Sequence, residues 1–240
     1  MPRFFASFSE NAGAARLDEE EMHHARDVMR MKPGEEVTLI IDDRLFLSAF
    51  SPSGDFPLLS ELPSTEPSVR VTLYQGVPKG DKMDFITQKC VEAGVYAIVP
   101  VAFSRCVSRW EKGKDEEKKR ARYNRIAREA AKQSGRAHCP QVMPCLSFQE
   151  MLRALPAHGA ALAPWECAGS GGLKTFVEKS GLPRDVALVI GPEGGIGEEE
   201  MAAMAQAGAL PVTLGKRILR TETAGLAALV ALMALSGNME

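Results

Sequence analysis

The apolar run Ala187-Leu-Val-Ile190 leads directly into Gly191-Pro-Glu-Gly-Gly195, and this succession of an apolar run and a glycine loop decides the fold. A short apolar run bounded by turn residues is typical of a buried strand. The glycines permit a sharp turn and a close approach to a ligand, so the loop presents backbone amides rather than side chains. A second loop, Leu214-Gly-Lys-Arg-Ile-Leu-Arg220, follows the predicted strand Pro211–Leu214. Because open α/β sheets bind ligands beyond their strand ends, we expect both loops to converge on one ligand site.

A glycine-rich pentapeptide can also be only a tight connection between two elements. The second loop favours a binding site, because two such loops seldom arise for packing alone. Neither loop contains the phosphate-binding pattern G-x-x-x-x-G-K-[ST], and no G-x-G-x-x-G opens a helix. Nucleotide hydrolysis and ordinary dinucleotide binding are therefore disfavoured.

The composition excludes several classes of protein. With 45% hydrophobic residues, 25% charged residues and a net charge of -2 over 240 residues, neither disorder nor a globally basic nucleic-acid binder is indicated. Polar residues follow Met1–Phe5 at once, and the apolar stretch Ala224–Leu235 is too short to span a bilayer, so we expect a cytoplasmic protein with no membrane role. The five cysteines lack zinc-ligand spacing, and no metal site is expected.

The chain changes its pattern near residue 68. Short β-type runs such as Glu36–Ile41 and Leu45–Phe50 predict a small β-barrel over residues 1–68. The segment Leu62–Ser68 is rich in proline and polar residues, which is typical of a linker. Beyond it, strand Val69–Gln75, helix Asp81–Ala93 and later alternating elements predict an α/β domain with a parallel sheet over residues 69–240.

Positive charge is concentrated locally. Between Arg105 and Arg136 there are twelve lysines or arginines and five acids, a pattern that indicates contact with a polyanion such as RNA. The alternative is a solvated helix face on which opposite charges support one another. A second basic cluster, with Arg3, Arg26 and Arg30, lies in the predicted barrel.

Motifs spread over nearly the whole chain closely resemble the 16S ribosomal RNA uridine-N3 methyltransferases, a family of the SPOUT superfamily of S-adenosylmethionine-dependent RNA methyltransferases. Their combination is far more specific than any one motif. In chain order they are Arg3-Phe-Phe5, Val28-Met-Arg30, Lys79-Gly-Asp-Lys-Met-Asp84, Glu92-Ala-Gly-Val95, Ser104-Arg-Cys-Val107, Gln133-Ser-Gly-Arg136 and the two loops above. Departures are modest: Ile196-Gly197 replaces a bulky residue followed by Ser or Thr, and Asp42-Asp43 replaces a commoner Asp-Gly.

The resemblance implies a PUA-like, RNA-binding β-barrel at residues 1–68, followed at 69–240 by an α/β-knot methyltransferase domain with a C-terminal trefoil knot. Family members are typically homodimers, and the alanine-rich C-terminal helix would suit such an interface. The implied partners are 16S rRNA in the small ribosomal subunit and a second copy of the chain. The implied cofactor is S-adenosylmethionine, with no metal. It would be held largely by main chain at Ala163, Gly191, Gly194, Leu214, Gly215, Ile218, Leu219 and Thr221.

Methylation of uracil N3 requires help with its proton, because N3 is a poor nucleophile until that proton leaves. A positioned base can remove the proton, or cationic donors can stabilise the charge that develops on the uracil carbonyls. We expect Arg220 and Arg136 to hold a carbonyl or phosphate, and Glu193 or Glu222 to accept the proton. The predicted RNA-binding residues are Arg3, Arg26, Arg30, Lys79, Lys82, Arg105 and Arg109.

Three other functions remain open at this point. A ribose 2′-O-methyltransferase could use the same cofactor loops, since these do not specify the accepting atom. A non-catalytic RNA-binding protein could retain the fold without binding the cofactor. A phosphate-binding enzyme with glycine loops is the third, and the absent lysine motif weighs against it.

Overall fold

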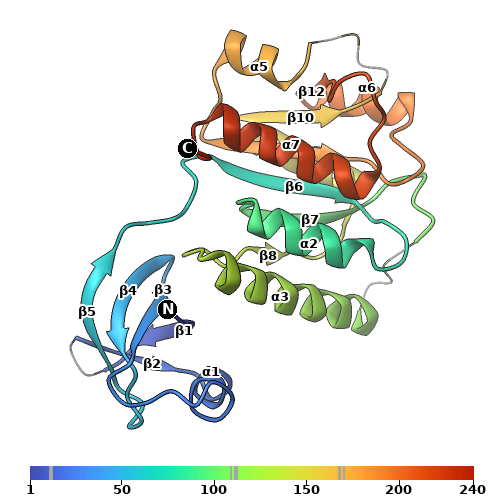
Figure 1. Cartoon of the computed structure of the whole chain (residues 1–240). Helices are drawn as coiled ribbons and strands as arrows, with labels where there is room; N and C mark the ends of the chain where they lie inside the picture. Colours follow the sequence, from blue (N-terminus) through green and yellow to red (C-terminus); the bar gives the residue numbers. More distant parts are fainter. Residues whose placement is uncertain (11–12, 109, 111–112, 167–168, 170) are drawn as a thin grey trace. The chain divides into compact units, whose positions relative to one another are not determined.

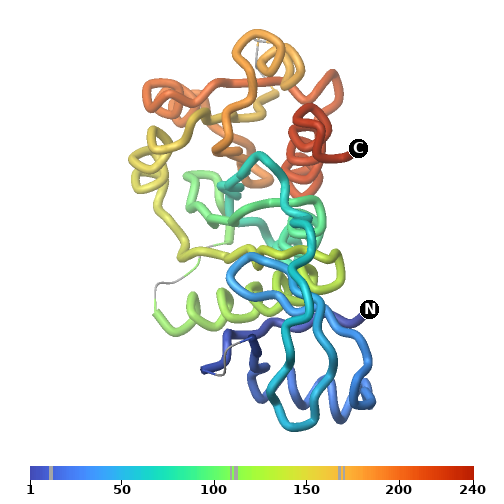
Figure 2. The backbone as a smooth tube through the Cα atoms, turned by 90° about the vertical axis from the view of Figure 1, so that its left-hand side faces the viewer, coloured from blue at the N-terminus to red at the C-terminus, as the bar shows by residue number. Residues whose placement is uncertain are grey.

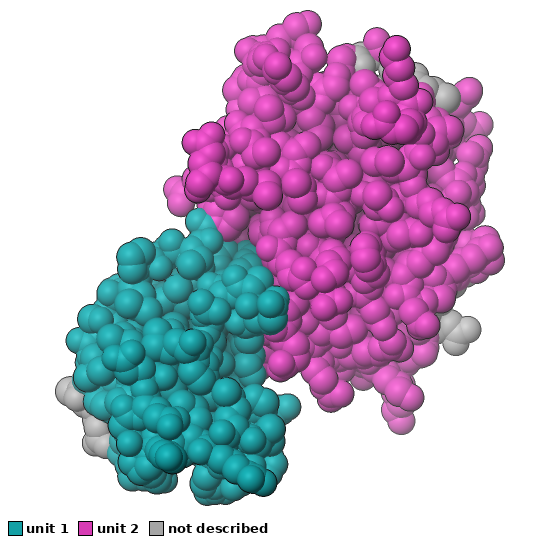
Figure 3. Space-filling model, in the orientation of Figure 1, with its two compact units in different colours: residues 1–66, 131–139 teal, residues 67–130, 140–240 magenta. Residues whose placement is uncertain are grey.

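The computed structural model describes residues 1–10, 13–108, 110, 113–166, 169 and 171–240. The chain divides into two compact units (Figure 3). Unit 1 contains residues 1–66 and 131–139, and unit 2 contains residues 67–130 and 140–240. The return of residues 131–139 to unit 1 has no counterpart in the sequence pattern.

Unit 1 is built on a closed five-stranded barrel in the order β1-β2-β5-β4-β3 (Figure 2, blue to cyan). Strand β1 pairs in parallel with β3, and the other neighbours are antiparallel. Closure leaves no unpaired sheet edge. In chain order the elements are β1 (Arg3–Phe8), β2 (Ala14–Leu17), α1 (Glu19–His23), the π-helical turn η1 (His24–Val28), β3 (Glu36–Ile41), β4 (Arg44–Ala49) and β5 (Phe56–Leu62). The predicted barrel is thereby confirmed.

The barrel interior is filled by side chains that alternate along its strands, among them the fully buried Phe4, Leu39 and Phe56. Strands β3 and β4 are joined by Asp42-Asp43, both with positive φ, at 49° and 59°. A two-residue hairpin turn needs this conformation at both positions, and aspartate tolerates it better than most residues other than glycine. The turn noted in the sequence therefore keeps its usual geometry without a glycine.

The carboxylate of Glu66 binds residues 131–139 within unit 1. It accepts hydrogen bonds from the backbone N–H groups of Ala137 (2.8 Å) and His138 (2.9 Å), and it pairs with the guanidinium of Arg136. Lys132 Nζ lies 3.0 Å from Glu21 Oε2. These buried ionic contacts explain why the end of a helix that begins in unit 2 belongs to unit 1.

Unit 2 is an α/β layer structure around a parallel sheet with the strand order β12-β10-β11-β6-β7-β8, in which β9 also pairs with β7 (Figure 1). Its strands are β6 (Arg70–Gly76), β7 (Ala97–Ala102), β8 (Gln141–Val142), β9 (Leu146–Ser147), β10 (Ala160–Pro164), β11 (Asp185–Ile190) and β12 (Ala209–Val212). Its helices are α2 (Lys82–Glu92), α3 (Lys114–Ser134, which ends in unit 1), α4 (Phe148–Ala154), the 3-10 turn η2 (Leu155–Ala157), α5 (Leu173–Ser180), α6 (Glu198–Gln206) and α7 (Thr221–Leu235).

Helices cover both faces of this sheet, which is why its strands read as continuous apolar runs. Helices α2 and α7 pack against each other in front of the sheet in Figure 1. Gly225 of α7 lies against Leu73 and Ile190, where an added Cβ would be 3.5 and 3.6 Å from their side chains. On the other face, Met151 of α4 and Met204 of α6 join the core with alternate strand residues. The predicted parallel α/β architecture is confirmed.

Of two boundaries near the second and first loops, one differs from the sequence prediction and one agrees with it. The strand predicted at Pro211–Leu214 runs instead from Ala209 to Val212, so Thr213 and Leu214 belong to the following loop. Helix α6 begins after Gly197 as expected, and Glu200 accepts the Gly197 N–H at 3.1 Å. That carboxylate compensates for the missing side-chain cap at Gly197.

No helix among the described residues is both long and apolar enough to cross a bilayer. Within the same part of the chain, no cluster of three histidine, cysteine or acidic side chains is arranged to hold a metal ion. Cys90, Cys106, Cys139 and Cys145 are free thiols, and Cys167 lies outside the described residues.

Candidate active site

A cavity of about 460 Å³ lies in unit 2 beyond the carboxyl ends of β10 and β11. This volume is in the range of small-molecule sites, roughly 300–1,000 Å³. Its lining comes from three segments, residues 164–166 at the end of β10, 190–196 at the end of β11, and 218–221 with Ala224 at the start of α7, together with Lys82 of α2. A smaller cavity of about 120 Å³ shares residues 164–166 and extends along residues 213–219. The two glycine loops of the sequence therefore do converge on one site.

The first loop is a tight turn, in which Gly195 donates its N–H to the carbonyl of Pro192 at 2.9 Å and has φ of 72°. The loop backbone also passes directly against the end of β6. A Cβ atom added to Gly76 would lie 2.5 Å from Pro192 N. Trp165 closes the far side by donating its indole N–H to the carbonyl of Ile196 at 3.2 Å. Main chain from two neighbouring strand ends therefore forms this wall of the cavity.

The second loop is fixed by Thr213 and Gly215. The hydroxyl of Thr213 accepts the N–H of Gly215 at 3.1 Å and lies 3.2 Å from the Gly215 carbonyl, to which it donates. Gly215 has φ of 103°, a conformation that strains any side-chain-bearing residue. The loop then runs to Arg220, whose carbonyl accepts the N–H groups of the first turn of α7.

A buried relay connects the two loops through Thr221. Its hydroxyl donates to the carbonyl of Gly191 at 2.6 Å and accepts from Nε2 of Gln75 at 2.8 Å. Gln75 is fully buried and Thr221 nearly so. One hydroxyl group therefore links three segments, namely the end of β6, the loop after β11 and the start of α7.

Replacement of Thr221 by valine is expected to lower the free energy of unfolding by about 1–3 kcal/mol, because a buried carbonyl and a buried amide would each lose a partner. Urea unfolding of the variant measures this loss. The matched control is Thr223→Val, since Thr223 is exposed two residues further along α7. Its expected effect stays within about 0.5 kcal/mol. Equal stability of the two variants would show that the Thr221 hydroxyl does not stabilise the fold.

Three charged side chains at the cavity, those of Lys82, Glu193 and Glu222, form a cluster. Nζ of Lys82 lies 2.9 Å from Glu193 Oε1 and 3.3 Å from Glu222 Oε2, and the N–H of Lys79 donates to Glu193 Oε1 at 2.9 Å. Partial burial pushes the pKa of Glu193 upward, but the Lys79 N–H and the Lys82 ammonium outweigh it, so this pKa is lowered overall. The hydrogen bond to Glu193 raises the pKa of Lys82. Glu193 is therefore ionised and Lys82 protonated near neutral pH.

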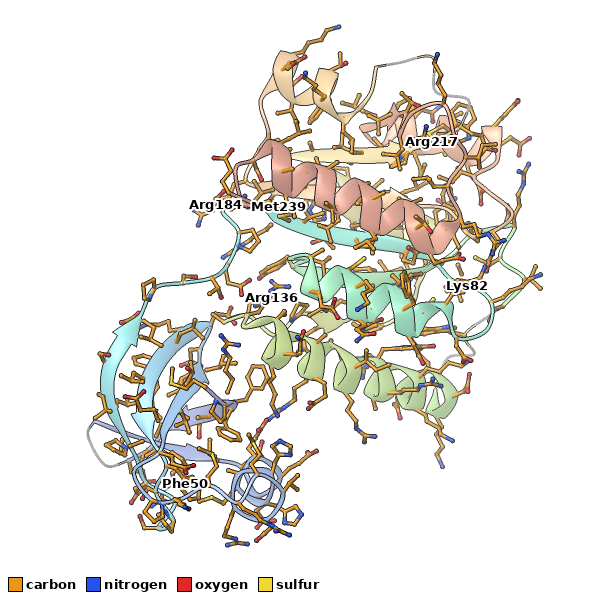
Figure 4. The ribbon with its side chains drawn as sticks, viewed as in Figure 1. Phe50, Lys82, Arg136, Arg184, Arg217 and Met239 are labelled. Atoms are coloured by element: carbon orange, nitrogen blue, oxygen red, sulfur yellow. The ribbon has the colours of Figure 1, made fainter. Side chains whose placement is uncertain are left out.

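Arg220 differs from these groups, because its guanidinium is exposed at the cavity and makes no ion pair or hydrogen bond with any described residue. Arg105 is also exposed but donates to the carbonyl of Gly194 at 3.1 Å. Figure 4 places Lys82 at the start of α2 and Arg217 in the loop before α7. Arg220 is thus a cation at the cavity that is available to a ligand.

The structure brings most of the predicted cofactor residues together. Gly191, Gly194, Leu214, Gly215, Ile218, Leu219 and Thr221 line one or both cavities. Ala163 does not, because it is fully buried in the sheet, and its neighbour Pro164 lines both cavities instead.

The predicted catalytic residues are only partly brought together. Arg220 and Glu193 line the larger cavity, and Glu222 reaches it through Lys82. Arg136 lies in unit 1, where it is 5% exposed and paired with Glu66. Its guanidinium is committed to that structural pair and lies outside the residues that line the cavities.

The predicted RNA-binding residues fall into three groups. Lys82 lines the cavity in unit 2, and Lys79 and Arg105 lie beside it through hydrogen bonds to Glu193 and to the carbonyl of Gly194. Arg3, Arg26 and Arg30 belong to unit 1, where Arg26 pairs with Asp27 at 3.1 Å and Arg30 is exposed with φ of 54°. Arg109 lies outside the described residues.

Sequence reasoning missed two sets of lining residues. Trp165 and Glu166 follow β10, whose place beside β11 puts them at the same edge of the sheet. The strand end after Ala160–Pro164 was the available signal. Lys216 and Arg217, in the loop that was correctly identified, line the smaller cavity and are exposed. With Arg220 they place three cations on one short loop.

Residues 65–233 match a family model described as an RNA methyltransferase domain, and residues 17–50 match one described as an RNA methyltransferase PUA domain. The first match spans most of the chain, so the chain is of the RNA methyltransferase class.

Similar proteins define the family more narrowly. Ribosomal RNA small subunit methyltransferase E of Bacillus subtilis is 35% identical over 97% of this chain and 96% of its own. The enzyme of that name from Neisseria gonorrhoeae, solved with S-adenosyl methionine bound, is 34% identical, with a TM-score of 0.85 over 98% of each chain. A Legionella pneumophila protein solved with the bound cofactor SAM is 30% identical, with a TM-score of 0.82 over 97% of this chain and 96% of its own. This chain belongs to the ribosomal RNA small subunit methyltransferase E family.

Proposed function

We propose that this protein methylates N3 of a specific uridine in the 16S rRNA of the small ribosomal subunit, with S-adenosylmethionine as methyl donor. The observation that carries the proposal is the convergence of two glycine loops on one cavity beyond the ends of β10 and β11. Its family membership supports the same reaction, because relatives bear the name of a small-subunit rRNA methyltransferase and two have structures with the cofactor bound.

The residues present fit such a cofactor. The cavity volume is suitable, and Gly191, Gly194, Leu219 and the carboxylate-bearing Glu166 line it. The apolar side chains of Ile196 and Leu219 supply surface for a planar base. When bound, S-adenosylmethionine supplies a methyl group already activated for displacement from a sulfonium.

The protein's own residues have three tasks in this proposal. Arg220 holds a uracil carbonyl and stabilises the negative charge that develops there as N3 loses its proton. A carboxylate of the Lys82 cluster receives that proton. Lys79, Arg105, Arg217 and the unit 1 residues Arg3, Arg26 and Arg30 bind phosphates.

Three further features belong to the same proposal. Helix α7 has no charged residue after Glu222, and Leu226 and Val230 stay half-exposed in the single chain, which supports a homodimer that covers them. Membership of the RNA methyltransferase family supports a trefoil knot in the C-terminal part. We also propose a cytoplasmic location, because the proposed substrate is the small ribosomal subunit.

The test is methyl transfer from labelled S-adenosylmethionine to small subunits from cells lacking the modification, followed by mass spectrometry of the digested nucleosides. We expect labelled 3-methyluridine, dependent on active protein. A labelled 2′-O-methylnucleoside would show that the protein methylates ribose rather than uracil N3. Binding of RNA without any cofactor binding in calorimetry would indicate a non-catalytic RNA-binding protein.

A further inference from the structure

The ammonium of Lys82 lies where two carboxylates from different segments meet at the cavity. Glu193 comes from the loop after β11 and Glu222 from the first turn of α7, and Nζ is within 3.3 Å of an oxygen of each. The side chains of Lys82, Glu193 and Glu222 are 31%, 26% and 18% exposed. The lysine is thus half-buried and paired with two carboxylates.

The position of Lys82 on its helix also requires an explanation. It is the first residue of α2, where the helix dipole favours negative side chains and disfavours a cation. Glu222, in the first turn of α7, has the favourable arrangement. A lysine at this end of α2 is therefore explained by its two carboxylate partners rather than by helix stability.

We infer that Lys82 is a positioning residue of the methyl-transfer site, which fixes Glu193 at the cavity as the ionised carboxylate that takes the substrate proton, while Glu222 anchors Lys82 from α7. This inference rests on the proposed function and revises the expected role of Lys82 in RNA binding. In the step concerned, the N3–H bond of uracil breaks and its electron pair stays on N3. The proton goes to the carboxylate of Glu193, whose Oε1 already accepts from Lys79 and Lys82.

The charges around this cluster come from several elements. Apart from its partners they include Arg220 and Glu166 at the same cavity and Arg105 beside Gly194. The buried thiol of Cys106 and the carboxylate of Glu200 of α6, which accepts from the Ser104 N–H, lie nearby. Asp81 and Asp84 at the start of α2 both face Arg122 of α3. None of these cations lies within ion-pair distance of Glu193 in the described part of the chain. Lys82 is therefore the positive charge whose removal should act most strongly on Glu193.

The sign of the expected pH effect follows from the lowered pKa of Glu193. A base with a lowered pKa stays ionised, and so active, down to a lower pH. In the wild type the acidic limb, meaning the fall in rate on the acid side of the pH profile, therefore occurs at low pH. In Lys82→Met the compensating charge is lost, the pKa of Glu193 rises and the acidic limb moves up by about one pH unit. Below the limb this is about a tenfold loss in rate. Lys82→Arg retains the charge and should restore the limb.

The experiment is single-turnover methyl transfer to small subunits across pH with the full-length protein, its Lys82→Met and Lys82→Arg variants, and salt-dependent RNA binding for each. We expect the limb to shift in Lys82→Met only, with RNA affinity and its salt dependence unchanged. An unchanged limb with weaker RNA binding and a salt slope lower by about one would assign Lys82 to a phosphate and overturn the inference.

A second readout separates this inference from the proposed function. Carboxyl ¹³C titration by NMR measures the pKa of Glu193 without any reaction, and Glu222→Gln provides an opposite test. We expect the pKa to rise in Lys82→Met and not to rise in Glu222→Gln, since the latter removes a negative neighbour while its amide oxygen still accepts from Lys82. A pKa insensitive to Lys82 would refute the inference. A shifted pKa in a protein that forms no 3-methyluridine would refute the proposed function alone.

Discussion

Replacement of Arg220 by alanine is expected to lower kcat for methyl transfer by about 10²–10³-fold, the usual effect of removing one donor to a developing oxyanion. The exposed guanidinium lines the cavity and has no described protein partner, so its loss leaves the surrounding structure unchanged. Single-turnover rates with saturating RNA and cofactor measure the effect, and calorimetry should find cofactor affinity little altered. Arg220→Lys should recover only part of the rate, because an ammonium lacks the planar fork of donors.

The matched control is Arg184→Ala. Arg184 is also exposed, but it precedes β11 and lies at the opposite end of the sheet from Arg217 and the cavity (Figure 4). This variant should transfer methyl groups at the wild-type rate. Equal rates for the Arg220 and Arg184 variants would exclude Arg220 from the reaction and leave charge stabilisation to another group.

Replacement of Gly76 by alanine should damage both the stability and the activity of unit 2. The new Cβ would lie 2.5 Å from Pro192 N and 2.8 Å from the carbonyl carbon of Gly191, and both are backbone atoms that cannot rotate away. Overpacking of this kind costs about 1–3 kcal/mol, and a displacement of about 1 Å in the loop can reduce the rate about 10²-fold. Thermal unfolding and cofactor titration measure the two effects.

Gly169→Ala is the control for Gly76→Ala. Gly169 has no positive φ, and no described heavy atom lies within 4 Å of the Cβ it would gain. Wild-type stability and cofactor affinity are expected for it. If Gly76→Ala bound the cofactor as the wild type does, the tight crossing of β6 and the first loop would not be needed to shape the cavity.

Local patterns in the sequence predicted the parts of the fold that depend on neighbouring residues. The run before Gly191 became β11, and the β-type run Glu36–Ile41 became a barrel strand, because burial on one or both faces dictates such patterns. The glycine loops also met as expected, since parallel strands end at the same edge of a sheet.

Contacts between segments distant in the chain could not be predicted from local sequence patterns. Arg136 was expected at the reaction site because it ends a basic segment, but its partner Glu66 is 70 residues away in the chain and holds it within unit 1. Lys82 was expected to bind RNA, and nothing in its local sequence shows that Glu193 and Glu222 share its ammonium. Isolated charges indicate which chemistry is available, whereas their pairing depends on the tertiary fold.

The central claim is that main chain in the two glycine loops binds the cofactor. Amide spectra of protein labelled with ¹⁵N only at its 21 glycines, recorded during titration with S-adenosylmethionine, test it most directly. We expect the signals of Gly191, Gly194, Gly195 and Gly215 to shift at saturating cofactor, while Gly34 and Gly54 of unit 1 stay in place. Shifts confined to unit 1, or a spectrum unchanged at saturating cofactor, would contradict the claim.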